Sequence, residues 1–128
     1  MRAELEEQLR SRYPKIFADW DKPLSESGMS FGLQCGDGWF DIIDALCRSL
    51  QRLTDEKGAS QIVASQVKQK FGTLRFHATD DLDEEQVQLL DDAMTLSSTT
   101  CEICGNPGKT LEFKRWRVAT RCEEHASE

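Results

Sequence analysis

Long apolar runs are missing from this sequence. No stretch approaches the roughly 20 apolar residues that a helix needs to cross a bilayer. Residues 1–10 are charged throughout, so they do not resemble a signal peptide. Internal repeats and low-complexity tracts are also missing. We therefore expect a cytoplasmic protein that does not contact a membrane, with room in 128 residues for one domain and a small appended module.

Basic residues are scarce relative to acids. Lys and Arg number 16 against 23 Asp and Glu, which gives a formal net charge of −7. A protein whose main partner is nucleic acid needs a basic surface, so this balance counts against that class. The five cysteines are an odd number, which argues against a disulfide framework and for a reducing compartment. Cys35 and Cys47 have no partner at ligand spacing, and we expect them to be small buried hydrophobic residues.

The candidate metal ligands form two pairs in the last quarter of the chain. Cys101 and Cys104 enclose two residues, and so do Cys122 and His125. Such pairs suit tetrahedral coordination, because each short turn presents two ligands to one ion. A histidine in the fourth place favours zinc over an iron–sulfur cluster, and the other alternative is a set of free thiols. Four protein ligands leave no position for water or substrate, so the sequence predicts a structural Zn²⁺ site.

The residues around these ligands predict a treble-clef-like zinc module over residues 100–128. Gly105–Gly108 supplies the glycine and proline conformations that turn a chain back on itself. Leu111–Ala119 alternates as a short strand or hairpin does. We expect Thr120 to cap a short helix that begins at Arg121 and carries the second ligand pair.

Residues 1–99 predict an α+β domain in which helices cover a small antiparallel sheet. The expected helices, each with an apolar face, are Glu4–Arg12, a central helix from Trp39 to Leu53, and Asp81–Leu96. The expected strands are Met29–Leu33 and a hairpin with the arms Gln61–Lys70 and Leu74–Ala78. Ile16, Phe17 and Trp20 are expected to anchor the first helix on the core, with an exposed aromatic patch as the alternative.

Acids mark the expected starts of two helices. We expect Asp37 to be the N-cap of the central helix, and the alternative is that the Gly36-Asp37-Gly38 turn binds an anion or a metal. Asp81 and Glu84 fit a capping box for the helix that follows.

Two surfaces are candidates for contact with a partner. Residues 80–92 contain seven acids and no base, which form either a solvated face or one that docks on a basic partner or mimics nucleic acid. The members of this candidate acidic face are Asp83, Glu84, Glu85, Asp91 and Asp92. The second surface lies between the ligand pairs and is either a strand face paired with acids or a contact to single-stranded nucleic acid. Its members are Lys114, Arg115, Trp116 and Arg117.

No nucleophile–base pair and no open metal site is visible, so the sequence predicts no catalytic residue. Asp37, Arg75 and His77 are the polar groups that an enzyme would have to use. Arg75 and His77, together with Lys68 and Lys70, equally fit the solvated face of an antiparallel sheet. We therefore expect a protein that is not an enzyme.

Six segments form the most recognisable pattern of the chain. They are Gly36–Trp39, Leu46–Cys47, Val67–Gly72, Leu74–Phe76, Cys101–Gly105 and Thr120–His125. From Gly36 onward, the sequence resembles a group of small zinc-binding proteins encoded by bacteriophages and prophages. The resemblance supplies no catalytic residue. It implies that the chain is an accessory protein of a phage. Small acidic proteins of that kind frequently bind and inhibit host machinery, including defence systems.

These inferences combine into one expected function and one alternative. The expected function is a non-enzymatic protein with a structural zinc ion that binds a host or phage protein in the bacterial cytoplasm and modulates or inhibits it. Either the acidic face or the zinc module would form the contact. The alternative is a zinc-finger-type regulator that binds nucleic acid through residues 114–117.

Overall fold

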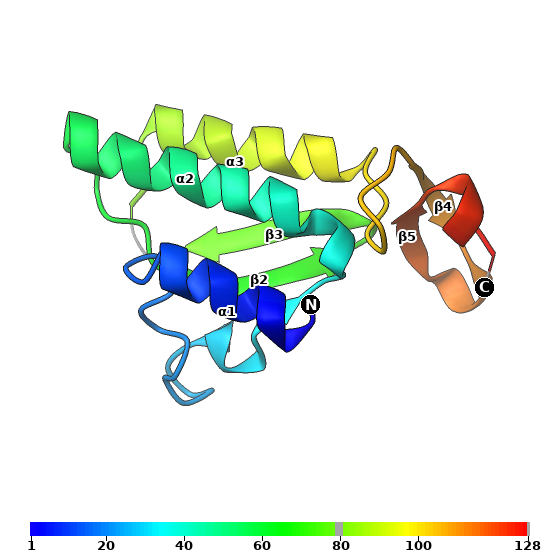
Figure 1. Cartoon of the computed structure of the whole chain (residues 1–128), viewed down its shortest axis with the longest axis horizontal. Helices are drawn as coiled ribbons and strands as arrows, with labels where there is room; N and C mark the ends of the chain where they lie inside the picture. The colour runs from blue at the N-terminus through cyan, green and yellow to red at the C-terminus, as the bar shows by residue number, and fades with distance from the viewer. Residues whose placement is uncertain (79–80, 128) are drawn as a thin grey trace.

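Three helices cover the apolar face of a small sheet in the computed structural model, which describes residues 1–78 and 81–127 (Figure 1). α1 spans Ala3–Arg12 and ends before Pro14, because a residue that precedes proline disfavours helix. α2 spans Phe40–Lys57 and α3 spans Glu84–Ser97, and these two helices lie side by side. The predicted α+β class is confirmed. Within the two described ranges, no helix is both long and apolar enough to cross a membrane.

The main sheet has the order β1-β2-β3. β2, Ala64–Lys70, and β3, Thr73–Ala78, form the predicted antiparallel hairpin. β1, Leu33–Gln34, pairs with β2 in parallel, so the sheet is mixed and not purely antiparallel. The predicted strand from Met29 is wrong, because Gly28–Phe31 is a turn of 3-10 helix that begins where the Ser27 hydroxyl accepts the backbone N–H of Met29.

The first strand of this hairpin contains a bulge. The register with β3 shifts between Ala64 and Gln66, so one extra residue of β2 lies opposite the partner strand. Ala64 and Val67 therefore both reach the core, although three positions separate them. The local sequence carries no marker for this shift.

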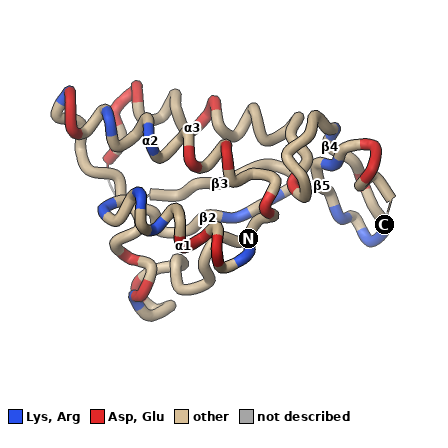
Figure 2. Tube along the Cα trace, viewed as in Figure 1, with Lys and Arg blue, Asp and Glu red and all other residues tan. Residues whose placement is uncertain are grey.

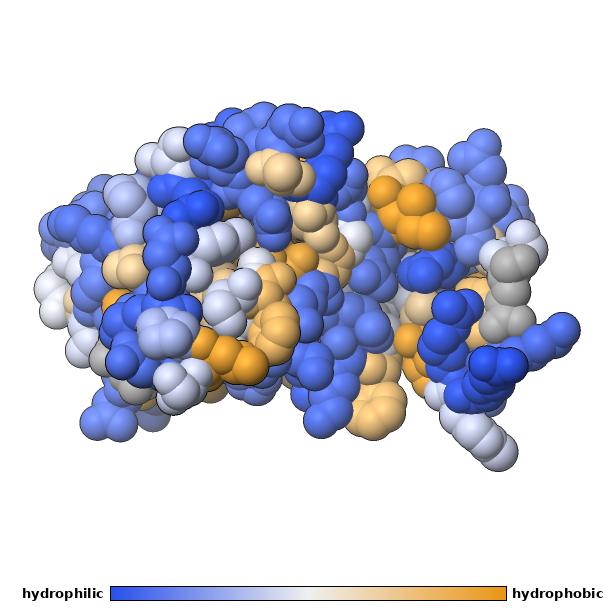
Figure 3. All heavy atoms as spheres, turned by 90° about the horizontal axis from the view of Figure 1, so that it is seen from below, coloured by the Kyte–Doolittle hydropathy of each residue, from blue (hydrophilic) through white to orange (hydrophobic). Residues whose placement is uncertain are grey.

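One hydrophobic core joins the helices to the inner face of the sheet. Leu33, Val67 and Phe76 are neighbours across the three strands and are all buried. The ring of Phe17 lies 6.5 Å from that of Phe76, and Ile16 is fully buried, so the expected anchor of α1 is confirmed. Seen from below, the surface of the molecule is largely hydrophilic, and its hydrophobic areas are small and separate (Figure 3).

The helix starts differ from the predicted caps. Asp37–Trp39 is a 3-10 turn in front of α2, and the Asp37 carboxylate accepts the backbone N–H of Arg2 at 2.8 Å, so its predicted role as N-cap is wrong. The capping box of α3 lies two residues later than predicted and consists of Asp83 and Gln86. Gln86 is fully buried and donates to the Ser60 carbonyl, which fixes the start of α3 at that point.

The C-terminal module contains the predicted hairpin, formed by β4, Lys109–Glu112, and β5, Val118–Arg121. The predicted helix from Arg121 is wrong: the chain forms a single 3-10 turn over Glu123–His125. Thr120 is a buried strand residue and not a cap, and its hydroxyl donates to the carbonyl of Gly72 at 2.6 Å. The order of knuckle, hairpin and short closing turn is that of a treble-clef-like module.

Candidate metal centre

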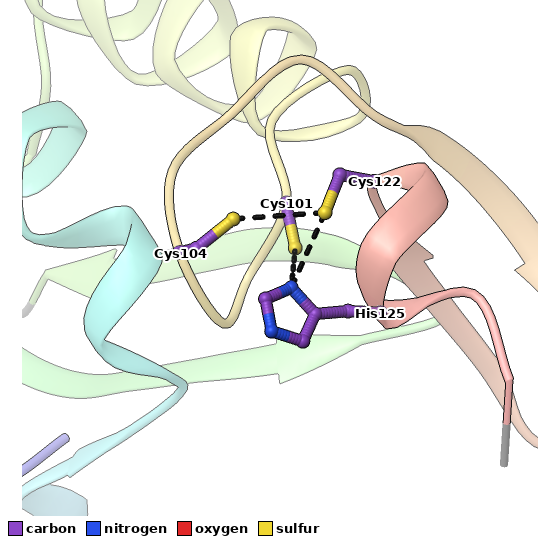
Figure 4. Close-up of side chains that lie close together, drawn as sticks. All are labelled: Cys101, Cys104, Cys122 and His125. Carbon is purple, nitrogen blue, oxygen red and sulfur yellow. Dashed lines mark hydrogen bonds between the residues drawn. The ribbon is translucent and has the colours of Figure 1, made fainter.

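The four predicted ligands meet at one point, although they come from two separate parts of the module (Figure 4). Cys101 and Cys104 belong to the knuckle that follows α3, while Cys122 precedes the closing turn after β5 and His125 is the last residue of that turn. Their ligand atoms all lie within 4.8 Å of one another. This is the one such cluster of metal-binding side chains in residues 1–78 and 81–127.

The distances between ligand atoms fit tetrahedral coordination. Zinc lies about 2.3 Å from sulfur and about 2.0 Å from nitrogen, which separates two ligand sulfurs by about 3.8 Å and sulfur from nitrogen by about 3.5 Å. The Sγ atoms of Cys104 and Cys122 are 3.6 Å apart. Nδ1 of His125 lies 3.2 Å from Sγ of Cys122 and 3.7 Å from Sγ of Cys101. The four side chains could therefore hold a metal ion, with spacing consistent with zinc.

Backbone hydrogen bonds hold both ligand pairs in place. In the knuckle, the N–H of Gly105 donates to the carbonyl of Cys101 at 2.9 Å, and Gly105 has a φ of 82°, which a residue with a side chain rarely adopts. The N–H of Cys101 donates to the carbonyl of Asn106 at 2.8 Å. In the closing turn, the N–H of His125 donates to the carbonyl of Cys122, so the imidazole returns over the thiol.

The electrostatics around Cys101 favour a thiolate. Burial by itself raises the pKa of this thiol, but the backbone N–H groups of Cys104, Cys122 and Ile103 point at its sulfur and lower the pKa to about 6. The opposite holds for Cys104: the backbone N–H of Asn106 acts to lower its pKa, but desolvation and the thiols of Cys122 and Cys101 together raise it. A bound cation would favour the thiolate form of both cysteines, because metal-bound sulfurs are thiolates.

The Gly36-Asp37-Gly38-Trp39 motif proves to be the contact surface between the body of the protein and the metal knuckle. A Cβ on Gly38 would lie 2.1 Å from the carbonyl oxygen of Cys101, and a Cβ on Gly36 would lie 2.3 Å from that of Glu102. The N–H of Gly38 donates to the Glu102 carbonyl at 2.8 Å. These glycines are required for close backbone approach, which the sequence alone did not reveal.

Two further side chains bind the same junction. Nε1 of the fully buried Trp39 donates to the carbonyl of Thr100 at 2.9 Å. The Glu102 carboxylate, which lies between the first two ligands in sequence, accepts the N–H of Gly36 at 2.9 Å and approaches the Arg121 guanidinium at 3.5 Å. We call the contacts of Gly36–Trp39 and Gly72 with the module the junction. They couple the geometry of the ligands to the folded body.

The other predicted contact residues are on the surface. Lys114, Arg115, Trp116 and Arg117 form the exposed tip of the β4–β5 hairpin, where Trp116 is 91% exposed. Of the acidic face, Glu84, Glu85, Asp91 and Asp92 lie exposed along α3, and Asp83 is its N-cap. Asp80, the first acid of the run, lies outside the described residues.

The polar groups considered for catalysis do not converge. Arg75 and His77 lie on β3, opposite Lys68 and Gln66 of β2. Asp37 is engaged with Arg2, and in the described part of the chain no hydrogen bond or ion pair joins it to Arg75 or His77. Cys35 and Cys47 are buried as expected, and desolvation raises the pKa of Cys35 to about 12.

The chain was compared with protein-family models, curated proteins and solved structures, and none of the three comparisons finds a match.

Proposed function

We propose that this protein is a non-enzymatic binding protein whose C-terminal module is held by one structural zinc ion and which docks on another protein through a groove between α2 and α3. The observation that carries the docking proposal is this apolar groove, one half of which is edged by acids alone. The four-ligand cluster supports a structural role for the metal, since catalytic zinc keeps a position for water or substrate.

The groove consists of two adjoining hollows. Their volumes are about 390 and about 290 Å³, and Ser49 and Leu89 line both. Leu53 of α2 and Leu96 of α3 add apolar surface towards the two ends, and Leu96 is 54% exposed. An apolar groove between two helices that lie side by side can accept the apolar stripe of a third, amphipathic helix.

The charges at the groove edge select the partner. In the first hollow, Glu85 is neutralised by Lys57 at 3.6 Å, and Arg52 lies 3.9 Å from Glu56. In the second hollow, the charged side chains that line it are acids, Asp41 and Asp92, and no base accompanies them among the lining residues. We therefore propose as occupant an amphipathic helix of a partner protein that places Lys or Arg beside its apolar stripe.

The resemblance to phage and prophage proteins suggests where this partner occurs. A small acidic protein made during infection meets the cytoplasmic proteins of its bacterial host, including defence systems. Occupying a basic amphipathic helix of such a protein would block the contacts that the helix normally makes. We propose inhibition or modulation of a host protein as the outcome.

The test uses the zinc-loaded full chain as bait in lysate of a bacterial host, followed by calorimetry with the purified protein that it recovers. Leu96→Glu and Asp92→Lys alter the second hollow at exposed positions, and each should weaken binding of that purified protein at least tenfold. Val87→Glu is the matched control, because Val87 is also exposed on α3 and does not line the groove. Recovery of no specific protein, or equal binding by all four chains, would refute the proposal.

A further inference from the structure

Three non-glycine residues in the described chain have a left-handed backbone, and all three lie at hairpin tips. Phe71 has a φ of 53° in the β2–β3 turn, while Arg115 and Trp116 have φ values of 63° and 61° between β4 and β5. This conformation is unfavourable for bulky side chains, and glycine or asparagine adopts it more readily. Bulky residues held there call for a reason other than folding.

The same residues are unusually exposed. Trp116 is 91% exposed and Phe71 is 65% exposed, the two highest values among the exposed large hydrophobic side chains of the described chain. Neither ring is therefore buried enough to offset the free-energy cost of its left-handed backbone. Strain and exposure together indicate that these rings contact something outside the chain.

The two tips belong to hairpins that pack on each other. The β2–β3 turn points towards the β4–β5 hairpin (Figure 1). A Cβ on Gly72, the residue after Phe71, would lie 3.0 Å from Thr110 Cγ2 and 3.4 Å from Val118 Cγ1. The Thr120 hydroxyl closes this contact by donating to the Gly72 carbonyl. The β2–β3 tip therefore lies against the side of the β4–β5 hairpin, beside Val118, which follows Trp116 by two residues, so a single strand of several nucleotides can extend from one tip to the other.

Cations accompany the rings. Nζ of Lys70 lies 5.6 Å from the centre of the Phe71 ring. Lys68 and Arg75 are register partners on the polar face of β2 and β3, and in the described part of the chain neither forms an ion pair with an acid. Strands β1, β2 and β3 contain no acid, whereas acids recur along α2 and α3 (Figure 2). The polar face of the main sheet therefore carries cations without acids of its own.

We propose that a tip surface, formed by Lys68, Lys70, Phe71, Arg75, Arg115 and Trp116, binds single-stranded nucleic acid. Exposed rings can stack on unpaired bases of any sequence, and the cations between them can contact the phosphates. A duplex hides the faces of its bases, so it offers the rings nothing to stack on. The surface lies apart from the α2–α3 groove, so this binding and the docking of a protein are independent and can fail separately.

The experiment measures fluorescence anisotropy of the zinc-loaded full chain with a labelled 20-nucleotide oligo(dT), an oligo(U) of the same length, and a 20-base-pair duplex. Phe71→Asn and Trp116→Asn should each weaken binding of the single strands about tenfold, because one stacked base is lost. Asparagine tolerates the left-handed backbone, so both variants should keep the fold, which circular dichroism verifies. Phe31→Asn is the matched control, since it removes a ring that is 56% exposed outside the tip surface.

Salt dependence tests the cations. With about four phosphates contacted, the logarithm of the affinity should fall with the logarithm of salt concentration with a slope of about −3. Lys70→Glu should reduce the magnitude of this slope by about one, and Arg52→Glu, the same change on α2, should leave it unaltered.

Absence of binding to either single strand at 50 mM salt would overturn the proposal, and so would equal effects of the Phe31 and Phe71 variants. If instead the Phe71 and Trp116 variants weaken only a protein partner, the tip surface is a protein contact and the proposal is wrong.

Discussion

The body of the protein and its C-terminal module are stabilised in different ways. The buried hydrophobic core extends from Leu9 to Ala93 and draws on all three helices and the main sheet. In residues 100–127, Ala119 is the one apolar residue other than cysteine that is buried. The body can therefore fold by burying apolar surface, whereas the module has too little to bury, and we expect its fold to depend on a metal ion held by the four ligands.

Removing the metal should have the largest effect, and it should affect the two regions differently. A strong chelator, or Cys101→Ser, should unfold the module and leave the body folded, because binding of a structural zinc ion contributes on the order of 10 kcal/mol to folding of such modules. Amide signals in NMR spectra should collapse for residues 100–127 and persist for the core of the body. Elemental analysis should find one zinc per wild-type chain and none in the variant.

Cys35→Ser is the control for this experiment, because Cys35 is a buried thiol outside the cluster. It should retain one zinc per chain. Signals that stay dispersed throughout the module after complete metal removal would show that the module folds without the ion.

Gly38→Ala tests the contact between the body and the C-terminal module. The new methyl group would meet the Cys101 carbonyl oxygen at 2.1 Å, so the knuckle must move away from the body. We expect a loss of about 3 kcal/mol in the free energy of unfolding, measured with denaturant on the zinc-loaded protein. Gly58→Ala is the matched control: Gly58 has a φ of 72° but no atom within 4 Å of the added methyl, so only about 1 kcal/mol should be lost. Equal losses would mean that the junction is not tightly packed.

Asp44 provides a test confined to the body. It is 7% exposed, and its carboxylate accepts the Tyr13 hydroxyl at 2.8 Å, Arg12 at 3.0 Å and Arg48 at 2.8 Å, which ties α1 to α2. Asp44→Asn should lower the free energy of unfolding by about 2 kcal/mol, because the buried Tyr13 hydroxyl and two partly exposed arginines lose a charged acceptor. Asp55→Asn, at an exposed position of the same helix, should change it by less than about 0.5 kcal/mol. The zinc content should stay the same in both.

The same carboxyl group gives the body a defined dependence on pH. Desolvation acts to raise the pKa of Asp44, but hydrogen bonds from Tyr13 and Arg12 and the charges of Arg12 and Arg48 outweigh it and hold the pKa below its ordinary value of 3.8. The stabilisation is thus present above that value and is lost as the pH falls through the lower pKa of the folded state. The difference in unfolding free energy between wild type and Asp44→Asn should shrink as the pH falls below about 4. A difference that is constant down to pH 2 would contradict this assignment.

The features predicted from the sequence are those encoded by neighbouring residues. The ligand pairs, the faces of the helices and the two hairpins all follow from spacings of two to four residues. The junction could not be found in this way, because Gly36 meets Glu102 across 66 positions and Thr120 meets Gly72 across 48. Thr120 looks like a cap in sequence, but its hydroxyl donates to the carbonyl of Gly72 in the β2–β3 turn of the body. The bulge beside Ala64 has no local signal either, and the left-handed backbone of Phe71 runs against the local preference of a bulky residue.

The smallest expected effect compares the two hairpin tips. Phe71→Asn and Trp116→Asn both place a residue suited to left-handed backbone where a bulky one now stands, so each should stabilise its hairpin by about 1 kcal/mol. Phe71 belongs to the body, so its gain should appear in thermal unfolding both with and without zinc. Trp116 belongs to the module, so its gain should appear only when the metal holds the hairpin in place. If Trp116→Asn stabilised the metal-free chain to the same degree, the β4–β5 hairpin would have to persist without its ligands, and the module could not owe its fold to the ion.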